Sequence, residues 1–163
     1  MNVRNATPED ERDIATLISQ FRVELKKLKD VQTEPDIKKA REEFRGYIAA
    51  KYPIFVAEDD NGSLGAYLVC RIIDNVVWVE SIFVSEKERR KGIAAQLFHR
   101  AEKLALDLGN ETLYLWIHPN NDKMVAFLSK LDYDVLNLIE IRKKLTNEKI
   151  SSKLKVGSHD YYY

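Results

Sequence analysis

The stretch Glu80-Ser-Ile-Phe-Val-Ser-Glu-Lys-Glu-Arg-Arg-Lys-Gly-Ile-Ala-Ala-Gln-Leu-Phe98 organises the rest of the chain. It runs from an apolar strand through a charged turn with one glycine, Gly92, into a helix. A chain that passes from a strand into a helix points several backbone N–H groups in one direction, and these donors have no partner within the helix. The helix dipole adds partial positive charge at the same end. The stretch therefore predicts a site for an oligophosphate.

The residue types in the turn suit such a site. Gly92 has no Cβ to obstruct a ligand, and Ala94 and Ala95 keep the first helical turn narrow. Three cations form the rim of the site: Arg89, Arg90 and Lys91. The bare pattern Arg-x-x-Gly-x-Ala also fits an ordinary connection between a strand and a helix, so the wider context has to distinguish the two.

That context resembles the acetyl-CoA-binding motif of the GNAT superfamily of N-acetyltransferases. Val84 stands five residues before Arg89, and Arg89-Arg-Lys-Gly-Ile-Ala94 opens a long amphipathic helix. A second block, residues 114–133, is similar to that family's strand, asparagine and short helix. The resemblance extends over residues 3–145. It implies an α/β fold with a mixed sheet, in which two central strands splay apart and helices cover both faces.

The order of the elements agrees with this layout. Apolar alternation and turn signals predict strands over residues 3–6, 54–58, 64–72, 76–84, 112–117 and 135–143. Helical spacing and capping residues predict helices that begin at Pro8, after Asp36, in the Gly92 turn and at Asp122. Residues 1–145 are thus predicted to form the GNAT domain. Residues 146–163 lack periodicity and are read as a polar tail, either disordered or packed on a neighbouring subunit.

Composition excludes several classes of protein. A chain of 163 residues suits one domain with a continuous core. Its 26 basic and 26 acidic side chains cancel, so the chain as a whole has no attraction for nucleic acid or an anionic membrane. No apolar run approaches the roughly 18 residues of a membrane span, and the N-terminus lacks the apolar core of a signal peptide. We expect a soluble, cytoplasmic protein without nucleic-acid or membrane partners.

Cysteine and histidine are sparse. Cys70 is the only cysteine, which excludes an internal disulfide and suits a reducing compartment. Because it stands in an alternating apolar strand, we expect a buried structural thiol and not a nucleophile. His99, His118 and His159 are dispersed along the chain, so no metal site is predicted.

The resemblance implies a set of residues that bind acetyl-CoA, the expected cosubstrate. Ile82, Phe83 and Val84 would supply main-chain groups to the pantetheine arm, which lies between the splayed strands in this family. The pyrophosphate would be bound by the N–H groups of Arg89, Arg90, Lys91, Gly92, Ile93, Ala94 and Ala95. Asn121 stands where the family's asparagine bonds the end of the pantetheine. The first two helices would line the site of the acceptor, which the sequence does not name.

Transfer of an acetyl group to an amine requires the amine to lose a proton. At pH 7 this costs about 4.6 kcal/mol for a lysine-like amine with a pKa near 10.4, but only about 1 kcal/mol for an α-amine. Glu80 is the candidate base. It stands nine residues before Arg89 and, by the period of two, on the same strand face as Ile82 and Val84. Some GNAT enzymes look similar in placing a glutamate there. The alternative is a structural glutamate held in a salt bridge.

Two positions depart from the family pattern. Many members carry a tyrosine seven residues after the asparagine, as the acid that protonates the thiolate, and this chain has Leu128. Water or another residue would then do so, or the chain binds CoA without turning it over. Protein N-terminal acetyltransferases often have a glutamate or histidine where this chain has Trp116. Trp78 and Trp116 could stack an acceptor, but both stand in predicted strands, which favours core positions. His118 is a weaker candidate base.

The sequence therefore predicts an N-acetyltransferase that moves an acetyl group from acetyl-CoA to a primary amine by direct attack. The acceptor could be a small molecule, a polyamine or a peptide amine, and a homodimer is left open. The rival hypothesis is a non-catalytic acyl-CoA-binding or regulatory module. A nucleotide-binding module fits less well, because the lysine-serine ending of a P-loop is missing.

Overall fold

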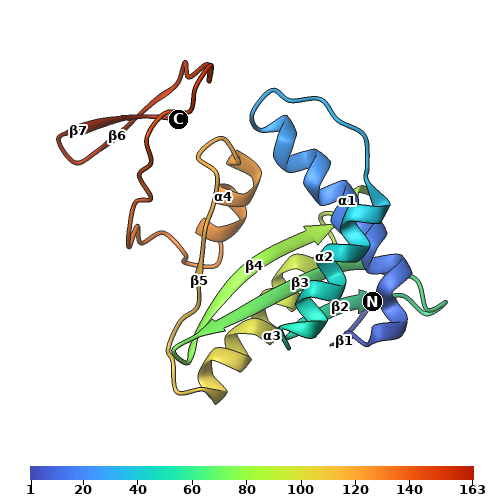
Figure 1. The fold of residues 1–163 in the computed structure, drawn as a ribbon. Coiled ribbons are helices and arrows are strands. Elements are labelled where there is room, and N and C mark those ends of the chain that lie inside the picture. The colour runs from blue at the N-terminus through green and yellow to red at the C-terminus, as the bar shows by residue number, and fades with distance from the viewer. The chain divides into compact units, whose positions relative to one another are not determined.

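The computed structural model describes residues 1–163. They divide into two compact units, Met1–Trp116 and Ile117–Tyr163. Figure 1 shows the sheet and three helices of the first unit and the single helix and small hairpin of the second. None of the helices combines the length and the apolar character that crossing a membrane requires. The division into a domain over 1–145 and a tail over 146–163 stays a prediction.

The first unit is built on a five-stranded mixed sheet in the order β1-β2-β3-β4-β5. Four strands run antiparallel to their neighbours, and β5 runs parallel to β4. The strands are β1 (Asn2–Asn5), β2 (Ile54–Glu58), β3 (Leu64–Ile73), β4 (Val76–Val84) and β5 (Tyr114–Leu115). The predicted mixed α/β sheet is confirmed, and β2 and β4 have the predicted bounds.

Helices cover both faces of this sheet. On one face lie η1 (Pro8–Asp10), α1 (Glu11–Lys27) and α2 (Ile37–Ala49), and η2 (Glu86–Glu88) leads to α3 (Ile93–Asp107) on the other. The opposite placement of α3 follows from Arg100, which lies 5.5 Å over the ring of Phe55. Phe55 points away from its neighbours Ile54 and Val56, which face α1 and α2.

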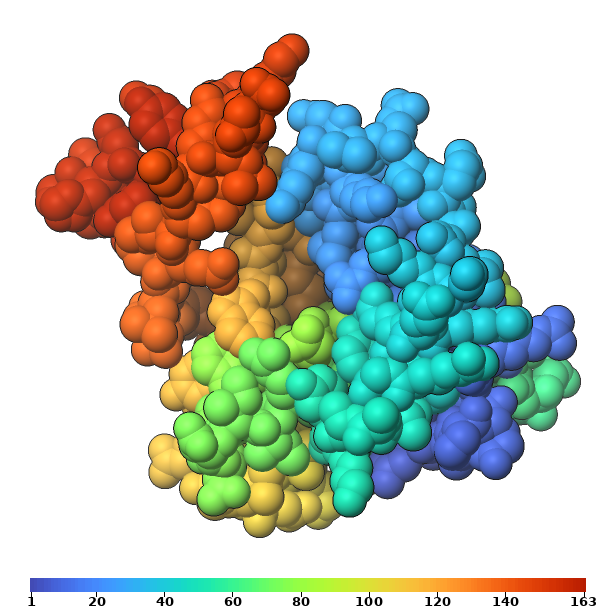
Figure 2. All heavy atoms as spheres, in the orientation of Figure 1, coloured from blue at the N-terminus to red at the C-terminus, as the bar shows by residue number.

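The main core lies between the sheet and the α1–α2 pair. In the space-filling view the side chains of α1 and α2 lie together as one layer (Figure 2). Their apolar stripes meet the inward side chains of β2, β3 and β4. The largest fully buried members of this cluster are Ile14, Ile18, Phe44, Val56, Tyr67 and Val69. Asp36 caps α2 by accepting a 2.9 Å hydrogen bond from the N–H of Lys39, as predicted.

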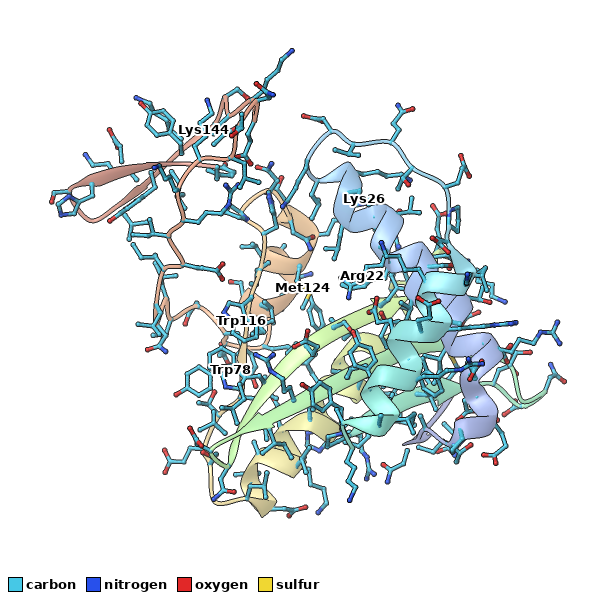
Figure 3. All side chains as sticks on the ribbon, viewed as in Figure 1. Arg22, Lys26, Trp78, Trp116, Met124 and Lys144 are labelled. Carbon is cyan, nitrogen blue, oxygen red and sulfur yellow. The ribbon has the colours of Figure 1, made fainter.

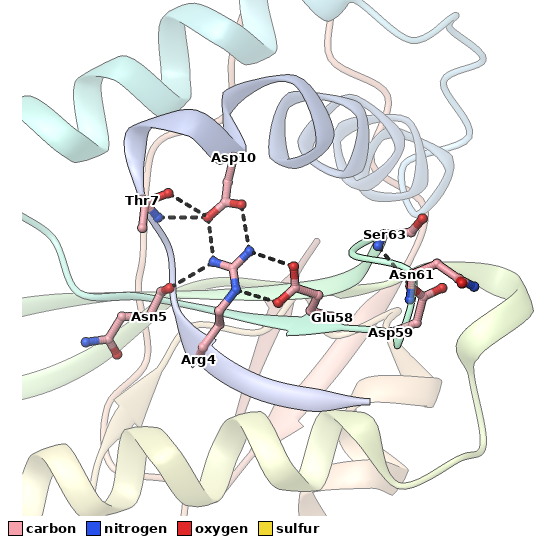
Figure 4. A network of polar contacts seen from close by, with 8 residues as sticks. All are labelled: Arg4, Asn5, Thr7, Asp10, Glu58, Asp59, Asn61 and Ser63. Atoms are coloured by element: carbon pink, nitrogen blue, oxygen red, sulfur yellow. Dashed lines mark hydrogen bonds and ion pairs between the residues drawn. The ribbon is translucent and has the colours of Figure 1, made fainter.

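A charged network ties β1, η1 and β2 together (Figure 4). The Arg4 guanidinium donates to both carboxylate oxygens of Asp10 at 2.8 and 2.9 Å, and to those of Glu58 at 2.7 and 3.2 Å. Asp10 also accepts a 2.8 Å bond from the N–H of Thr7. The hydrogen bonds from Arg4 hold the pKa values of Asp10 and Glu58 below their usual range.

We predict that Arg4→Gln lowers the free energy of unfolding by about 2 kcal/mol at pH 7, because two part-buried carboxylates lose a charged donor. Since the folded pKa values are depressed, this stabilisation is present above the unfolded values near 4 and is lost as pH falls through the folded ones. Urea titrations from pH 7 to pH 3 check this. The wild type should lose more stability with acid than the variant, and equal losses would contradict the assignment.

Two predicted strands are corrected by the structure. The strand expected over 112–117 is reduced to Tyr114–Leu115, because β5 pairs with β4 only at Trp78 and Val79. The strand expected over 135–143 is absent. Its apolar residues favour extended backbone, but no neighbouring strand pairs with them, and Val135 and Leu138 are 87% and 78% exposed. Propensity alone therefore did not make a strand here.

The second unit contains α4 (Asp122–Ser129) and an antiparallel hairpin of β6 (Lys153–Val156) and β7 (His159–Tyr162). The hairpin contradicts the expectation that the end of the chain is disordered. Gly157 adopts a φ of +61° in the two-residue turn, a conformation that glycine reaches without strain. The N–H of Tyr163 extends the pairing with a 3.2 Å bond to the carbonyl oxygen of Ser152.

Candidate active site

The turn before α3 presents a row of free backbone donors. Arg90 has a φ of +62° and Gly92 a φ of +77°, so the chain makes two left-handed steps within three residues. The first bond into the helix runs from the N–H of Gln96 to the carbonyl oxygen of Gly92, at 3.2 Å. The N–H groups of residues 90–95 donate no hydrogen bond within the protein. This is the donor set that a helix N-terminus offers to an anion.

Gly92 leaves space beside these donors. A Cβ built on Gly92 would meet no protein atom within 4 Å. Within the protein, only the positive φ therefore favours glycine at this position. Ile93 is buried, and Ala94 and Ala95 are half-buried, so the first helical turn is smooth. The site therefore fits a diphosphate group, which would lie against the row of amides.

The cations of the rim behave differently from one another. Arg89 points back toward β4, where its Nε donates to the carbonyl oxygen of Val84 at 3.0 Å. Its guanidinium lies 5.5 Å over the ring of Phe83. The same guanidinium is 3.9 Å from a carboxylate oxygen of Glu24. Lys91 pairs with Glu88 at 3.0 Å. Arg90 is exposed and forms no such pair.

The expectation of a free N–H at Arg89 is wrong. That N–H donates to the carbonyl oxygen of Glu86 at 3.3 Å, as the last bond of the η2 turn. The oxygen of Val84, predicted to bind pantetheine, already accepts the Arg89 side chain. Arg89 therefore fixes the junction between β4 and the turn, and the free amides begin at Arg90.

One edge of β4 is open over its second half. The pairs Trp78–Tyr114 and Val79–Leu115 are its whole ladder with β5, whereas its ladder with β3 continues to Val84. The edge along Ile82, Phe83 and Val84 that faces away from β3 thus has no partner strand in the first unit. The short ladder agrees with the predicted splay of the central strands. An extended ligand could pair with the open edge as an added strand does.

A β-bulge at Glu80 changes the direction of its side chain. Val79 pairs with Cys70 and Ser81 with Val69, so Glu80 has no partner residue on β3. Arg71, which is paired with Trp78, approaches Glu80 to 3.7 Å. Glu80 therefore lies on the sheet face that carries α1 and α2. The prediction from period two, which put it on the face of Ile82 and Val84, is wrong.

Aromatic rings lie next to the ion pair of Arg71 and Glu80. Trp78 and Trp116 stack with ring centroids 4.4 Å apart and planes at 18°, and both are labelled side by side in Figure 3. The guanidinium of Arg71 lies 5.2 Å from the Trp116 centroid. Trp116 is 52% exposed, so the prediction of a core position is wrong for this residue.

Two buried hydroxyls lie on the same face. Tyr67 and Ser81 are close enough to interact, but neither hydroxyl forms a hydrogen bond within the protein. Tyr47 donates to Glu43 at 2.6 Å, and Arg22 closes a two-bond fork on the same carboxylate. Burial raises the pKa values of Tyr47 and Tyr67, which keeps both phenols protonated at neutral pH.

Cys70 is buried, as predicted, and lies away from these groups on the α3 face of β3. Burial raises the pKa of its thiol to about 12, so the thiolate is scarce at neutral pH. The structure thus supports the interpretation of a structural thiol.

The other candidate residues lie in the second unit. Asn121 caps α4, accepting a 3.2 Å bond from the N–H of Met124 on its Oδ1. Its predicted contact with pantetheine stays a prediction. Leu128 is buried and cannot donate a proton. His118 accepts a 3.2 Å bond from the N–H of Asn120 on Nδ1 and packs edge-on against Tyr163.

A short ladder between the central strands and a helix N-terminus with free amides fit a long diphosphate ligand in extended form. Residues 19–133 match the Acetyltransferase (GNAT) family, so the chain belongs to this family and is an N-acetyltransferase. The resemblance noted in the sequence is confirmed. Members of the family use acyl-CoA donors.

Similar proteins agree with this assignment. A Bacillus subtilis (strain 168) protein named "Putative phosphinothricin acetyltransferase YwnH" is 27% identical over 128 residues, which cover 74% of this chain and 78% of that protein. A mutant of the BH1408 protein from Bacillus halodurans shares the fold with a TM-score of 0.73 at 20% identity, covering 89% of this chain and 100% of that one. AAC(6')-Iy, in complex with a CoA-linked bisubstrate analogue, has a TM-score of 0.68 at 19% identity, with 88% and 98% covered.

Proposed function

We propose that this protein transfers the acetyl group of acetyl-CoA to a primary amine of a small molecule, by direct attack of the amine on the thioester. The observation that carries the proposal is the row of free amides over residues 90–95, which follows β4 and its open edge in the chain. An acyl-CoA has a diphosphate for the amides and an amide-bearing pantetheine arm for the strand edge.

Different residues of the first unit would bind different parts of acetyl-CoA. The N–H groups from Arg90 to Ala95 would bind the diphosphate, and Arg90 would add a free positive charge. Main-chain groups of Ile82 and Phe83 would pair with the pantetheine arm, which holds the thioester near the bulge at Glu80. Acetyl-CoA supplies the activated acyl group when bound.

Glu80 is proposed to accept the proton of the amine, directly or through one water. Its carboxylate accepts no hydrogen bond within the protein and is 28% exposed. Its position on the α1–α2 face supports a role on the acceptor side of the thioester. A lysine-like amine costs about 4.6 kcal/mol to deprotonate at pH 7, so an acceptor of this basicity needs a base beside the thioester.

The departing thiolate is proposed to take its proton from water. Leu128 cannot supply one, and the phenols of Tyr47 and Tyr67 are buried. A thiol with a pKa near 8.5 is a fair leaving group at neutral pH, so a dedicated acid is not required.

The printed names of similar proteins suggest where to look for the acceptor. The Bacillus subtilis protein is named for phosphinothricin, and AAC(6')-Iy is complexed with an analogue of an acetylated neamine. We propose a small-molecule amine for this chain and a cytoplasmic location. The buried, unpaired Cys70 suits the latter.

The test is a thiol-release assay with acetyl-CoA and a panel of amines that covers amino acids, phosphinothricin, polyamines and aminoglycosides. We expect saturable thiol release with at least one class, and acetylated product by mass spectrometry. Binding of CoA without thiol release from any class would favour a second candidate, a CoA-binding module without turnover, which Leu128 also fits.

A further inference from the structure

The pair formed by Arg71 and Glu80 lacks the hydrogen bonds that most arginine–carboxylate pairs of the protein have. Arg4, Arg22 and Arg45 each close a fork on a carboxylate with hydrogen bonds between 2.6 and 3.2 Å. Arg71 approaches Glu80 only to 3.7 Å, which is beyond hydrogen-bond distance. Nε of Arg71 is buried and has no hydrogen-bond partner. Both charged groups therefore keep their hydrogen-bonding capacity unused.

Aromatic packing holds the free guanidinium in place. Arg71 lies against Trp116, and Trp116 stacks on Trp78, the residue opposite Arg71 across the β3–β4 ladder. An indole that covers one face of a guanidinium leaves the N–H groups at its edge available for a planar anion such as a carboxylate. The exposed half of Trp116 leaves this cluster open to solvent.

Arg22 and Glu43, on the same side of the sheet, are fully engaged with each other. Arg22 is neutralised by Glu43 through two hydrogen bonds, and Glu43 also accepts from Tyr47. The cluster around the bulge is left with one cation and one anion that face each other at 3.7 Å without a hydrogen bond. Because Arg71 and Glu80 stand on neighbouring strands, about 4.8 Å apart, a ligand that meets both must carry its own two charges close together.

We infer that the acceptor is a zwitterion of the α-amino acid type, whose carboxylate binds Arg71 while its ammonium meets Glu80. The inference rests on the proposed function and adds the substrate class to it. A long polyamine or an aminoglycoside offers only positive charges, so it would leave Arg71 unpaired and face its repulsion. The carboxylate contact fixes the amine beside the base, which makes Arg71 a specificity-determining residue.

Acceptors that differ only in the carboxylate measure how much this group contributes to the reaction. L-Phenylalanine and L-methionine are each compared with their amides and with their decarboxylated amines in the thiol-release assay. The amides hold their amines at a lower pKa, so a preference for the acids cannot come from easier deprotonation. We expect kcat/KM for the better acid to exceed that of its amide and its amine by about tenfold or more, as for a lost charge-assisted hydrogen bond.

Variants then assign the preference to Arg71. In Arg71→Gln the ratio of acid to amide should fall to within about twofold, mainly through a higher KM for the acid. Arg45→Gln, the matched control, removes an exposed arginine paired with Glu11 and should keep the wild-type ratio. Circular dichroism and the affinity for CoA show that each variant is folded.

A separate readout distinguishes the inference from the proposed function. Binding of the acid should place a carboxylate at the edge of the guanidinium that lies over Trp116 and change tryptophan fluorescence saturably, whereas the decarboxylated amine should not. Thiol release that is equal for acids and amines, or a ratio unchanged in Arg71→Gln, overturns the inference but keeps the enzyme. Saturable fluorescence change by the acids without thiol release from any amine overturns the proposed function but keeps the zwitterion site. If both thiol release and the fluorescence change are absent, the inference and the proposed function are both overturned.

Discussion

Replacing Glu80 by glutamine is expected to lower kcat by about 10²- to 10⁴-fold, the usual contribution of a positioned general base. Glutamine keeps the size of the side chain but cannot accept the proton of the amine. The affinity for CoA should be unchanged, because the free amides proposed to bind the diphosphate lie in the turn before α3. Steady-state thiol release and calorimetric titration with CoA measure the two quantities.

The matched control is Glu111→Gln, an identical chemical change at an exposed position before β5. It should leave kcat at the wild-type value. A kcat for Glu80→Gln that equals the wild type at every pH would remove Glu80 from the mechanism. A joint loss of kcat and of CoA affinity would instead indicate that the Arg71–Glu80 pair only maintains the bulge.

Replacing Gly92 by valine is expected to weaken CoA binding by at least about 100-fold, with two effects acting together. The new side chain would occupy the space beside the free amides, which no protein atom fills now. The φ of +77° disfavours any residue with a Cβ, by about 1–2 kcal/mol, so the turn would also relax. Calorimetric titration with CoA gives the affinity, and thermal unfolding shows whether the fold survives.

Gly109 provides the control for backbone strain. It ends α3 with a φ of +83°, and a Cβ there would also meet no atom within 4 Å. Gly109→Val should therefore lose similar stability but keep its affinity for CoA. Equal CoA affinity in Gly92→Val and in the wild type would refute the diphosphate site, and an equal loss in both glycine variants would attribute the effect to strain alone.

Most helices and strands of the first unit could be predicted from the sequence, because the signals for them lie within short stretches of the chain. Strands β2 and β4 are apolar runs bounded by turns, and the capping residue Asp36 sets the start of α2. The α3 N-terminus was likewise predictable, since Gly92 and the residues after it are contiguous. At the other end of α3, Gly109 and the bond from the N–H of Asn110 to the carbonyl oxygen of Ala105 form a C-cap, which a glycine after the last helical turn indicates.

The direction of Glu80 could not be predicted in this way. A bulge is a property of two strands in register, and nothing in the sequence of β4 alone shows that Val69 and Cys70 span three residues of it. The same holds for Arg71, which stands on β3 and joins the site only through the β3–β4 ladder. Strand alternation therefore gave the wrong face at the one position where alternation is interrupted.

At the end of the chain, one predicted strand is absent and one hairpin was not predicted. Residues 135–143 have the composition of a strand, but a strand also needs a partner for its backbone groups, and none pairs with them. The β6–β7 hairpin did leave a signal, since Gly157-Ser158 is a two-residue turn between short runs with apolar or aromatic residues. The many charged residues around it concealed that pattern.

The most direct test of the account is an NMR titration of the ¹⁵N-labelled protein with CoA, and in parallel with pantetheine, which lacks the diphosphate. The account predicts that the backbone amide signals of residues 90–95 move downfield and become protected from hydrogen exchange with CoA, but not with pantetheine. Amides of residues 90–95 that stay unchanged while CoA binds elsewhere would contradict it.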